Sequence, residues 1–262
     1  MSGLIKSLSK IARTFLYTCL LFSFGLFITY SSFIDNSFLI SPGAKLNINY
    51  SAGHSIAKKR AIKKSRSSAV QLISISFKDQ SASTFSGTYI KSSDNYFVLT
   101  VAHGLQGTCA ETKVIYDDEF YDCVKLIHVD QELDYALIQV DEIPKRTAIQ
   151  IPREIPNNRE WRRVFTLLHE VIYTGYPNTI GPLTFSGEIA GVAGYRYIYI
   201  NSYAWEGSSG SGVFDSDGNF IGYIVAVDIG KNDFGVQILN NLVLVIPSFH
   251  VDWTKTITEV KQ

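Results

Sequence analysis

The chain has 262 residues, of which 46% are apolar, enough to bury the core of one or two domains. Lysine and arginine number 24, as do aspartate and glutamate, so the near-zero net charge indicates neither nucleic acid nor an anionic surface as a general partner. With three cysteines and no Cys-x-x-Cys pair or Cys/His cluster, the sequence excludes a disulfide-dense scaffold and indicates no zinc site.

An uncharged, strongly apolar segment occupies Thr14–Ile34, which is about the length that crosses a bilayer as a helix. Basic residues precede it and Asp35 follows it, so the positive-inside rule predicts a cytoplasmic N-terminus and export of the rest. Residues 1–34 are therefore expected to be an uncleaved signal anchor, which the apolar length slightly favours, or a signal peptide cut near Thr29–Ser32. A mitochondrial presequence and a buried core helix are weaker alternatives.

Residues 35–66 are expected to form a polar, basic linker. Ser, Asn, Gly and Pro residues accompany a run of basic residues from Lys58 to Arg66, and no hydrophobic period is sustained. Such a run is usually a solvated, flexible stretch, and the alternatives are a membrane-surface contact or a processing site.

From Ser67 onward, short β-branched and aromatic runs alternate with turn residues, which predicts an all-β sandwich or barrel. The runs divide six and six near residues 145–163, which favours two small barrels at about 67–145 and about 160–250 within one domain, 67–262. The expected strands are 70–77, 84–90, 96–101, 113–116, 120–128, 134–140, 171–176, 183–189, 195–200, 212–214, 219–227 and 234–245.

Cys109 and Cys123 lie on either side of the expected strand at 113–116. In an oxidising compartment they can pair across a hairpin, and a loop of that length gains about 3 kcal/mol in the chain-entropy model. The alternative is two buried, reduced thiols, and the sequence leaves both open. Cys19 belongs to the apolar N-terminal segment.

Two strand ends carry residues suited to acid–base chemistry. His103 ends the apolar run VLTVAH, and a strand end can hold an imidazole rigidly at a cleft, where it suits general-base duty. Asp134 opens the run DYALIQV, where a carboxylate can turn inward and fix a histidine tautomer. Taken alone, the histidine is more often structural and the aspartate an ordinary turn residue.

Small residues surround one hydroxyl, that of Ser209, in the segment EGSSGSGVF. Gly207 permits backbone conformations that other residues resist, so its N–H and that of Ser209 can converge on one point. Such a pair forms an oxyanion hole, in which each donor is worth about 3–4 kcal/mol. A flexible Gly/Ser linker fits poorly, because strand-like residues flank the segment on both sides.

At these motifs the sequence resembles the trypsin-like serine peptidases. TVAH at His103 is similar to their TAAH signature, DYALIQV to their DLALL-type strand, and GSSGSG to the GNSGSP or GNSGGP box of the HtrA-like and glutamyl-endopeptidase branches. Softer matches are the GYP turn at Gly175–Pro177 and the strand pair at Gly218–Gly222. The order His, Asp, Ser is that of chymotrypsin and not of subtilisin or the α/β-hydrolases. The resemblance covers roughly residues 68–248.

The resemblance implies a chymotrypsin-like double barrel of two six-stranded antiparallel barrels with the site between them. It implies a serine endopeptidase that hydrolyses a protein or peptide through an acyl-enzyme, without cofactor or metal. His103 would be the general base, Asp134 would orient it, Ser209 would be the nucleophile, and the amides of Gly207 and Ser209 would bind the oxyanion. The alternatives are a catalytically silent trypsin-fold binding module and a membrane-anchored structural protein of unrelated β fold.

The sequence also departs from the family pattern. Ser208 replaces the usual Asn or Asp before the nucleophile, and Gly212 replaces proline. Ser211 is a rival nucleophile, but it has serine instead of glycine two positions earlier. No cysteine flanks His103, no trypsin-type activation site is evident, and we expect a protein without a PDZ domain.

The resemblance places the walls of the specificity pocket at residues 203–208 and at Val225, Ala226 and Val227. These walls are apolar, so a small or apolar residue is expected before the cleaved bond. The remaining histidines are expected to be structural or surface residues: His54, His128, His169 and His250.

Overall fold

The computed structural model describes residues 55–151, 165–194, 196–232 and 235–258, with only the backbone described over 226–240. The expected N-terminal helix at residues 1–34 lies outside the described residues, as does the first part of the expected linker. In the ranges that are described, no helix is long and apolar enough to span a bilayer.

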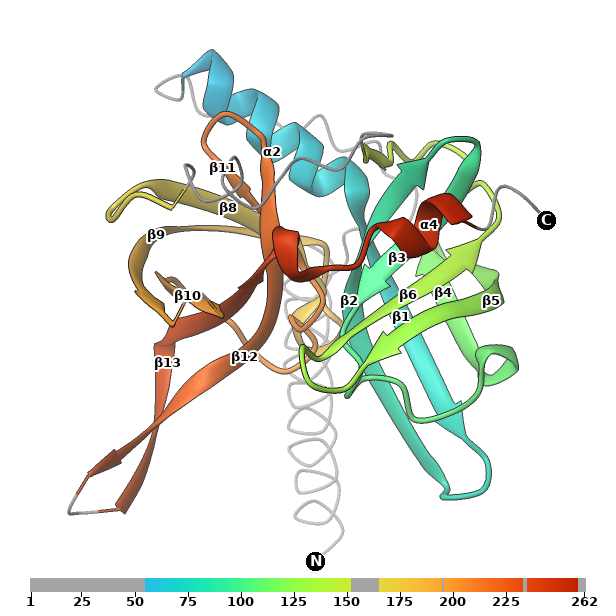
Figure 1. Cartoon of the computed structure of the whole chain (residues 1–262). Helices are drawn as coiled ribbons and strands as arrows, with labels where there is room; N and C mark the ends of the chain where they lie inside the picture. The colour runs from blue at the N-terminus through green and yellow to red at the C-terminus, as the bar shows by residue number, and fades with distance from the viewer. Residues whose placement is uncertain (1–54, 152–164, 195, 233–234, 259–262) are drawn as a thin grey trace, which may run out of the picture. The chain divides into compact units, whose positions relative to one another are not determined.

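The first barrel forms from six strands, as the sequence predicts (Figure 1). They pair antiparallel in the order β1-β4-β5-β6-β3-β2, and pairing of β1 with β2 closes the barrel. The short strand β7 adds to β2 in parallel, which makes the sheet seven-stranded. The sequence does not predict β7, because a strand of two residues is too short to show a hydrophobic pattern. The strands are β1 Ala69–Ser76, β2 Ser81–Ser92, β3 Asn95–Thr100, β4 Thr112–Tyr116, β5 Glu119–Asp130, β6 Tyr135–Val140 and β7 Ile149–Gln150.

The second barrel is also closed and six-stranded, in the order β10-β13-β12-β11-β8-β9. Every neighbouring pair is antiparallel, and β12 and β13 form a long hairpin (Figure 1). The expected pair of six-stranded antiparallel barrels is therefore confirmed. The strands are β8 Glu170–Gly175, β9 Leu183–Ala193, β10 Tyr197–Asn201, β11 Gly212–Asp215, β12 Phe220–Asn232 and β13 Gly235–Pro247.

The apolar core joins the two barrels. One buried cluster contains first-barrel side chains such as Leu99 and Leu137 and also Phe214, Tyr223 and Ile246 from the second barrel. Burial of apolar surface contributes about 25 cal/mol per Å², so this shared cluster stabilises the docking of the barrels as well as their folding. A site formed by residues from both barrels is thereby held in one arrangement.

Helix α2, Ile56–Ser68, occupies the end of the range where the sequence predicted a linker. The expectation of an irregular segment was wrong for these residues. The side chain of Ser55 caps the helix by accepting from Lys58 N, and Lys58 forms an ion pair with Glu170 on β8. Ser65 on the buried face donates to Thr174 Oγ1 at 2.8 Å.

The helix was missed because its buried face consists of Ala61, Ser65 and Ser68, which give no apolar period. Its first turn has no acidic residue, and the basic residues there oppose the helix dipole. Contacts with the second barrel, such as the bond from Lys64 Nζ to the carbonyl of Gly218 at 2.7 Å, therefore stabilise this helix.

The remaining regular elements are short. Trp253, which is 1% exposed, packs at the edge of Phe220 and donates through Nε1 to the carbonyl of Ser248 at 2.9 Å, which anchors the C-terminal segment. These elements are the 3-10 turns η1 Cys109–Glu111, η2 Pro177–Thr179 and η3 Ser248–His250 and the helix α4 Thr254–Thr258.

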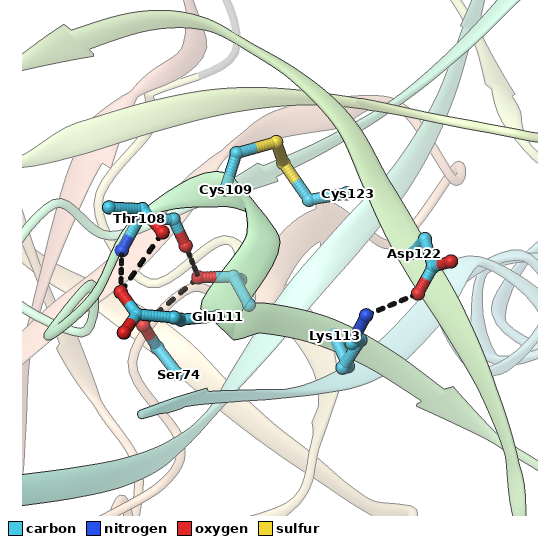
Figure 2. The surroundings of a disulfide bond; sticks show 8 residues. Ser74, Thr108, Cys109, Glu111, Lys113, Asp122 and Cys123 are labelled. Atoms are coloured by element: carbon cyan, nitrogen blue, oxygen red, sulfur yellow. Dashed lines mark hydrogen bonds and ion pairs between the residues drawn. A yellow bond between two sulfur atoms is a disulfide. The ribbon is translucent and has the colours of Figure 1, made fainter. Parts of the chain in front are cut away.

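Cys109 and Cys123 form a disulfide, so the structure decides between the two alternatives left open by the sequence (Figure 2). Their Cα atoms are 5.3 Å apart, and they are 14 positions apart along the chain. Cys109 opens η1, in which Glu111 accepts from both the N–H and the hydroxyl of Thr108, and Cys123 lies on β5. The disulfide therefore connects the loop that follows His103 to the barrel wall.

We expect the double variant Cys109→Ala/Cys123→Ala to unfold more easily than wild type by about 3 kcal/mol, because a loop of this length is no longer closed in the unfolded chain. Urea unfolding with and without reductant measures the difference. Reduced wild type should match the double variant. Equal stability of oxidised wild type and the double variant would contradict the assignment.

Candidate functional site

His103 and Asp134 meet because strands β3 and β6 are antiparallel neighbours, with Thr100 paired to Ala136. Asp134 accepts twice from His103: its Oδ1 from the backbone N–H at 2.9 Å and its Oδ2 from ring Nδ1 at 2.6 Å. The bond to Nδ1 assigns the ring proton to that nitrogen and leaves Nε2 as an acceptor. The His103 side chain is 53% exposed, so this acceptor is accessible.

The backbone at Asp134 is held from the second barrel. Its φ is 50°, a left-handed conformation that is uncommon for a residue other than glycine. The preceding carbonyl, of Leu133, accepts from the hydroxyl of Tyr223 on β12 at 2.7 Å, and Arg196 from the β9–β10 turn contacts both the carbonyl and the carboxylate of Glu132. Burial raises the pKa of Tyr223, so its hydroxyl remains a donor at neutral pH.

The loop of residues 207–212, which we call the nucleophile loop after the role proposed below for Ser209, needs glycine at two positions. Gly207 and Gly210 have φ of +90° and +88°. A Cβ at Gly207 would lie 2.6 Å from the carbonyl oxygen of Tyr176, and one at Gly210 would lie 2.0 Å from that of Ser86. Side chains at either position would therefore force the loop away from its neighbours.

Ser209 is half-buried in this loop, and its hydroxyl donates to the carbonyl of Val225 at 3.2 Å. Among the described residues, the Ser209 hydroxyl makes this hydrogen bond alone, and it makes none to His103. Ser211 is 0% exposed, and a Cβ placed on Gly175 would lie 2.2 Å from its Oγ. The Ser211 hydroxyl is therefore enclosed by its neighbours.

The structure also accommodates the unusual serine at position 208. Ser208 is 1% exposed, and its hydroxyl accepts from the N–H of Trp205 at 3.2 Å. The side chain therefore caps the turn from within, a role that needs no charged group.

Two backbone N–H groups of the loop have no acceptor among the described residues, those of Gly207 and Ser209. The carbonyl of Glu206 accepts from the N–H of Asn178 at 2.7 Å. Because N–H and C=O of a trans peptide point in opposite directions, this bond directs the N–H of Gly207 away from Asn178.

One cavity of about 540 Å³ contains His103, Asp134 and Ser209 on its wall. Apolar side chains such as Ile224 and Ile246 line it together with the carboxylates of Glu132, Asp134 and Glu206, and no lysine or arginine is among its lining residues. The cavity therefore brings together the three residues that the sequence singled out. The other lining residues are Glu132, Tyr197, Ala204, Trp205, Glu206, Ser208, Ile224, Val225, Leu244 and Ile246.

Residues 85–222 match the family described as a trypsin-like peptidase domain, which is more than half of the chain. The chain belongs to this family. The match spans all three motifs, and with the double barrel it places the protein among the trypsin-like serine peptidases of chymotrypsin fold. No curated protein matches the peptidase significantly in sequence.

Several solved structures have the same fold. A serine endoprotease from Yersinia pestis is 16% identical with a TM-score of 0.56, covering 78% of this chain and 64% of that one. The HtrA-type protease AlgW, solved with a tripeptide, is 19% identical with a TM-score of 0.57, covering 78% and 64%. Rv3671c from M. tuberculosis H37Rv, solved as an inactive serine-to-alanine mutant, is 16% identical with a TM-score of 0.56, covering 79% and 95%.

The peptidase thus spans 64% of the length of two of these relatives. At such identities the likeness concerns the fold alone. It agrees with the double barrel that the strand pairings show.

Several cavity residues of the peptidase were not predicted from its sequence. Of the three residues predicted to bind substrate, Val225 lines the cavity, whereas Ala226 and Val227 lie on β12 and their side chains are outside the described residues. Leu244 and Ile246 line the cavity from β13, and in sequence they are ordinary strand residues. Only the pairing of β12 with β13 brings them to the site.

In the described ranges, no group of three or more His, Cys, Asp or Glu side chains is placed to hold a metal. The other described histidines do not line the cavity. His128 stacks at an angle on Tyr135, and Nε2 of His169 is 3.1 Å from Ser216 Oγ. His250 contacts Phe249, and His54 lies outside the described residues.

We expect Tyr223→Phe to lower the free energy of unfolding by about 1–2 kcal/mol, because the carbonyl of Leu133 loses its donor. Turnover should fall roughly tenfold as Asp134 becomes less well placed. Tyr89→Phe is the matched control, since Tyr89 is buried, its hydroxyl accepts from Ile143 N at 2.9 Å, and neither residue lines the cavity. Urea unfolding and steady-state kinetics measure the two effects; equal turnover in both variants would refute the role of Tyr223.

Proposed function

We propose that the protein is a serine endopeptidase that cleaves peptide bonds through an acyl-enzyme, with His103, Asp134 and Ser209 as its triad. One observation carries the proposal: Asp134 accepts from both the backbone N–H and the ring Nδ1 of His103, on the wall of the same cavity as Ser209. Membership of the trypsin-like peptidase family supports it. A catalytically silent binding module is the alternative, and the complete set of three residues argues against it.

In the first half-reaction, the hydroxyl of Ser209 rotates from the carbonyl of Val225 toward His103. Nε2 of His103 takes its proton as Oγ attacks the carbonyl carbon of the substrate. The oxyanion that forms accepts from the N–H groups of Gly207 and Ser209. The C–N bond then breaks, and the amine leaves with the proton from His103, which gives the acyl-enzyme.

In the second half-reaction, His103 removes a proton from water, which attacks the ester carbon of the acyl-enzyme. The second oxyanion occupies the same hole, the ester bond to Ser209 breaks, and Oγ regains the proton. Asp134 stabilises the imidazolium in both halves, because its Oδ2 accepts from Nδ1. All of these steps use side chains and backbone of the chain, so the mechanism needs no cofactor or metal.

We expect a fluorophosphonate probe to label the wild-type protein and not Ser209→Ala, because the probe forms its bond to an activated serine oxygen. Ser211→Ala should label like wild type, since that hydroxyl is enclosed. Gel fluorescence and the mass of the labelled peptide report the site. Labelling that persists in Ser209→Ala, or that is lost only in Ser211→Ala, would reject Ser209 as the nucleophile. An unreactive wild type would favour the catalytically silent binding module.

We infer that the residue before the cleaved bond is small or apolar. Ala204, Ile224 and Ile246 line the cavity, and a charged side chain packed against them would lose part of its hydration. Val225, with Ala226 and Val227 after it on β12, is the proposed wall for this residue.

Peptides with Ala, Val or Leu before the cleaved bond should be hydrolysed at least about tenfold faster, in kcat/KM, than matched peptides with Lys or Asp, because burial of the charge costs more than 1.4 kcal/mol. A fluorogenic peptide panel that varies this single position measures the preference. A preference for Lys or Asp would contradict an apolar specificity pocket.

We further propose that the peptidase domain works on the non-cytoplasmic side of a membrane, tethered by the apolar segment Thr14–Ile34 or released after its cleavage. The disulfide between Cys109 and Cys123 supports an oxidising compartment. The proposed partners are a protein or peptide substrate and, for an uncleaved segment, the membrane; the composition indicates no nucleic acid.

A further inference from the structure

We propose that Ser86, on β2 of the first barrel, positions the oxyanion-binding peptide groups of the second barrel and so acts on turnover. The inference rests on the peptidase function proposed above. Ser86 is 0% exposed and does not line the cavity, so it is a positioning residue and touches no substrate. The family motifs in the sequence do not include it.

Ser86 binds the nucleophile loop at two points. Its backbone N–H donates to the carbonyl of Ser209 at 2.9 Å, and its hydroxyl donates to the carbonyl of Gly207 at 2.6 Å. The same hydroxyl accepts from the N–H of Tyr176 at 2.9 Å. Ser86 thus binds the carbonyls of Gly207 and Ser209, the same two residues whose backbone N–H groups have no acceptor among the described residues.

The bond to Gly207 matters because glycine is the residue whose peptide groups rotate most easily. The peptide before Gly207 is fixed where the carbonyl of Glu206 accepts from Asn178 N at 2.7 Å. The peptide after it is fixed where the carbonyl of Gly207 accepts from Ser86. With both flanking peptides fixed, the N–H of Gly207 keeps one direction before any substrate is bound, which is the preorganisation that oxyanion stabilisation needs.

Ser86 is itself held by the strand that carries the proposed general base. Its carbonyl accepts from Thr100 Oγ1 at 2.7 Å, and Thr100 ends β3 three positions before His103. Gly210 packs directly on the same carbonyl, where a Cβ would lie at 2.0 Å. Ser86 therefore connects the strand leading to His103 with the loop that carries Ser209 and leaves little room for either to shift.

Ser86→Ala tests the inference, because it removes the hydroxyl and keeps the backbone bond to Ser209. Removal of an oxyanion donor costs about 100- to 1000-fold in kcat, so a misdirected donor should lower kcat by roughly 10- to 100-fold. KM should change less than about threefold, since substrate contacts are untouched. The pH dependence of kcat/KM should keep its shape, because the pair of His103 and Asp134 is unaltered.

Ser92→Ala is the matched control. Ser92 lies on the same strand, is 1% exposed, and accepts from Thr256 Oγ1 at 3.1 Å, away from the cavity. The Ser92→Ala variant loses a comparable buried hydrogen bond and should keep the wild-type kcat. Ser86→Cys nearly preserves the side-chain volume with a weaker donor, so it should fold and show an intermediate kcat even where Ser86→Ala does not fold.

Full-length variants of equal purity are compared by urea unfolding, steady-state kinetics and fluorophosphonate labelling. Wild-type kcat in Ser86→Ala, or the same loss of kcat in Ser92→Ala, would overturn the inference. A wild type that reacts with the probe while Ser86→Ala and Ser86→Cys turn over normally rejects this role and leaves the proposed function intact. A wild type that does not react rejects the proposed function itself.

Discussion

The nucleophile loop of the second barrel is hydrogen-bonded to strand β2 of the first barrel, and the site depends on this contact. Ser86 donates to the carbonyls of Gly207 and Ser209, and Thr88 Oγ1 donates to that of Gly210 at 3.2 Å. In the same loop, the N–H groups of Gly207 and Ser209 have no acceptor among the described residues. The same contact sets how far the loop lies from the ends of β3 and β6, where the imidazole and carboxylate are.

Other contacts between the two barrels fix their positions on either side of that loop. The shared apolar cluster stabilises their contact, but apolar packing is non-directional and tolerates small shifts. Buried hydrogen bonds such as that from the Tyr223 hydroxyl to the carbonyl of Leu133 fix the relative orientation of the barrels. A buried polar group left without its partner costs about 1–3 kcal/mol, so such bonds resist displacement. Helix α2 adds a further connection, since it leads into β1 while its side chains bond to Thr174 and Gly218 in the second barrel.

Much of the fold could be predicted because its signals are local. Each strand has its own run of β-branched and aromatic residues, and turn residues mark where each run ends, so the twelve longer strands and their division into two barrels follow from the sequence. His103, Asp134 and Ser209 could be singled out for the same reason, since each stands in a short distinctive segment. Helix α2 could not, because its buried face of Ala and Ser residues shows no period and its stability comes from the second barrel.

The sequence by itself determined which residue types stand at the strand ends and in the glycine-rich turn, and hence the class of chemistry. Only the tertiary structure decided that Cys109 and Cys123 pair, that the Ser211 hydroxyl is enclosed, and that Ser86 and Tyr223 hold the site from the opposite barrel. The physical reason is that a hydrogen bond or an enclosure depends on distance in space. Ser86 and Gly207 are 121 residues apart along the chain, and nothing local to either reveals the other.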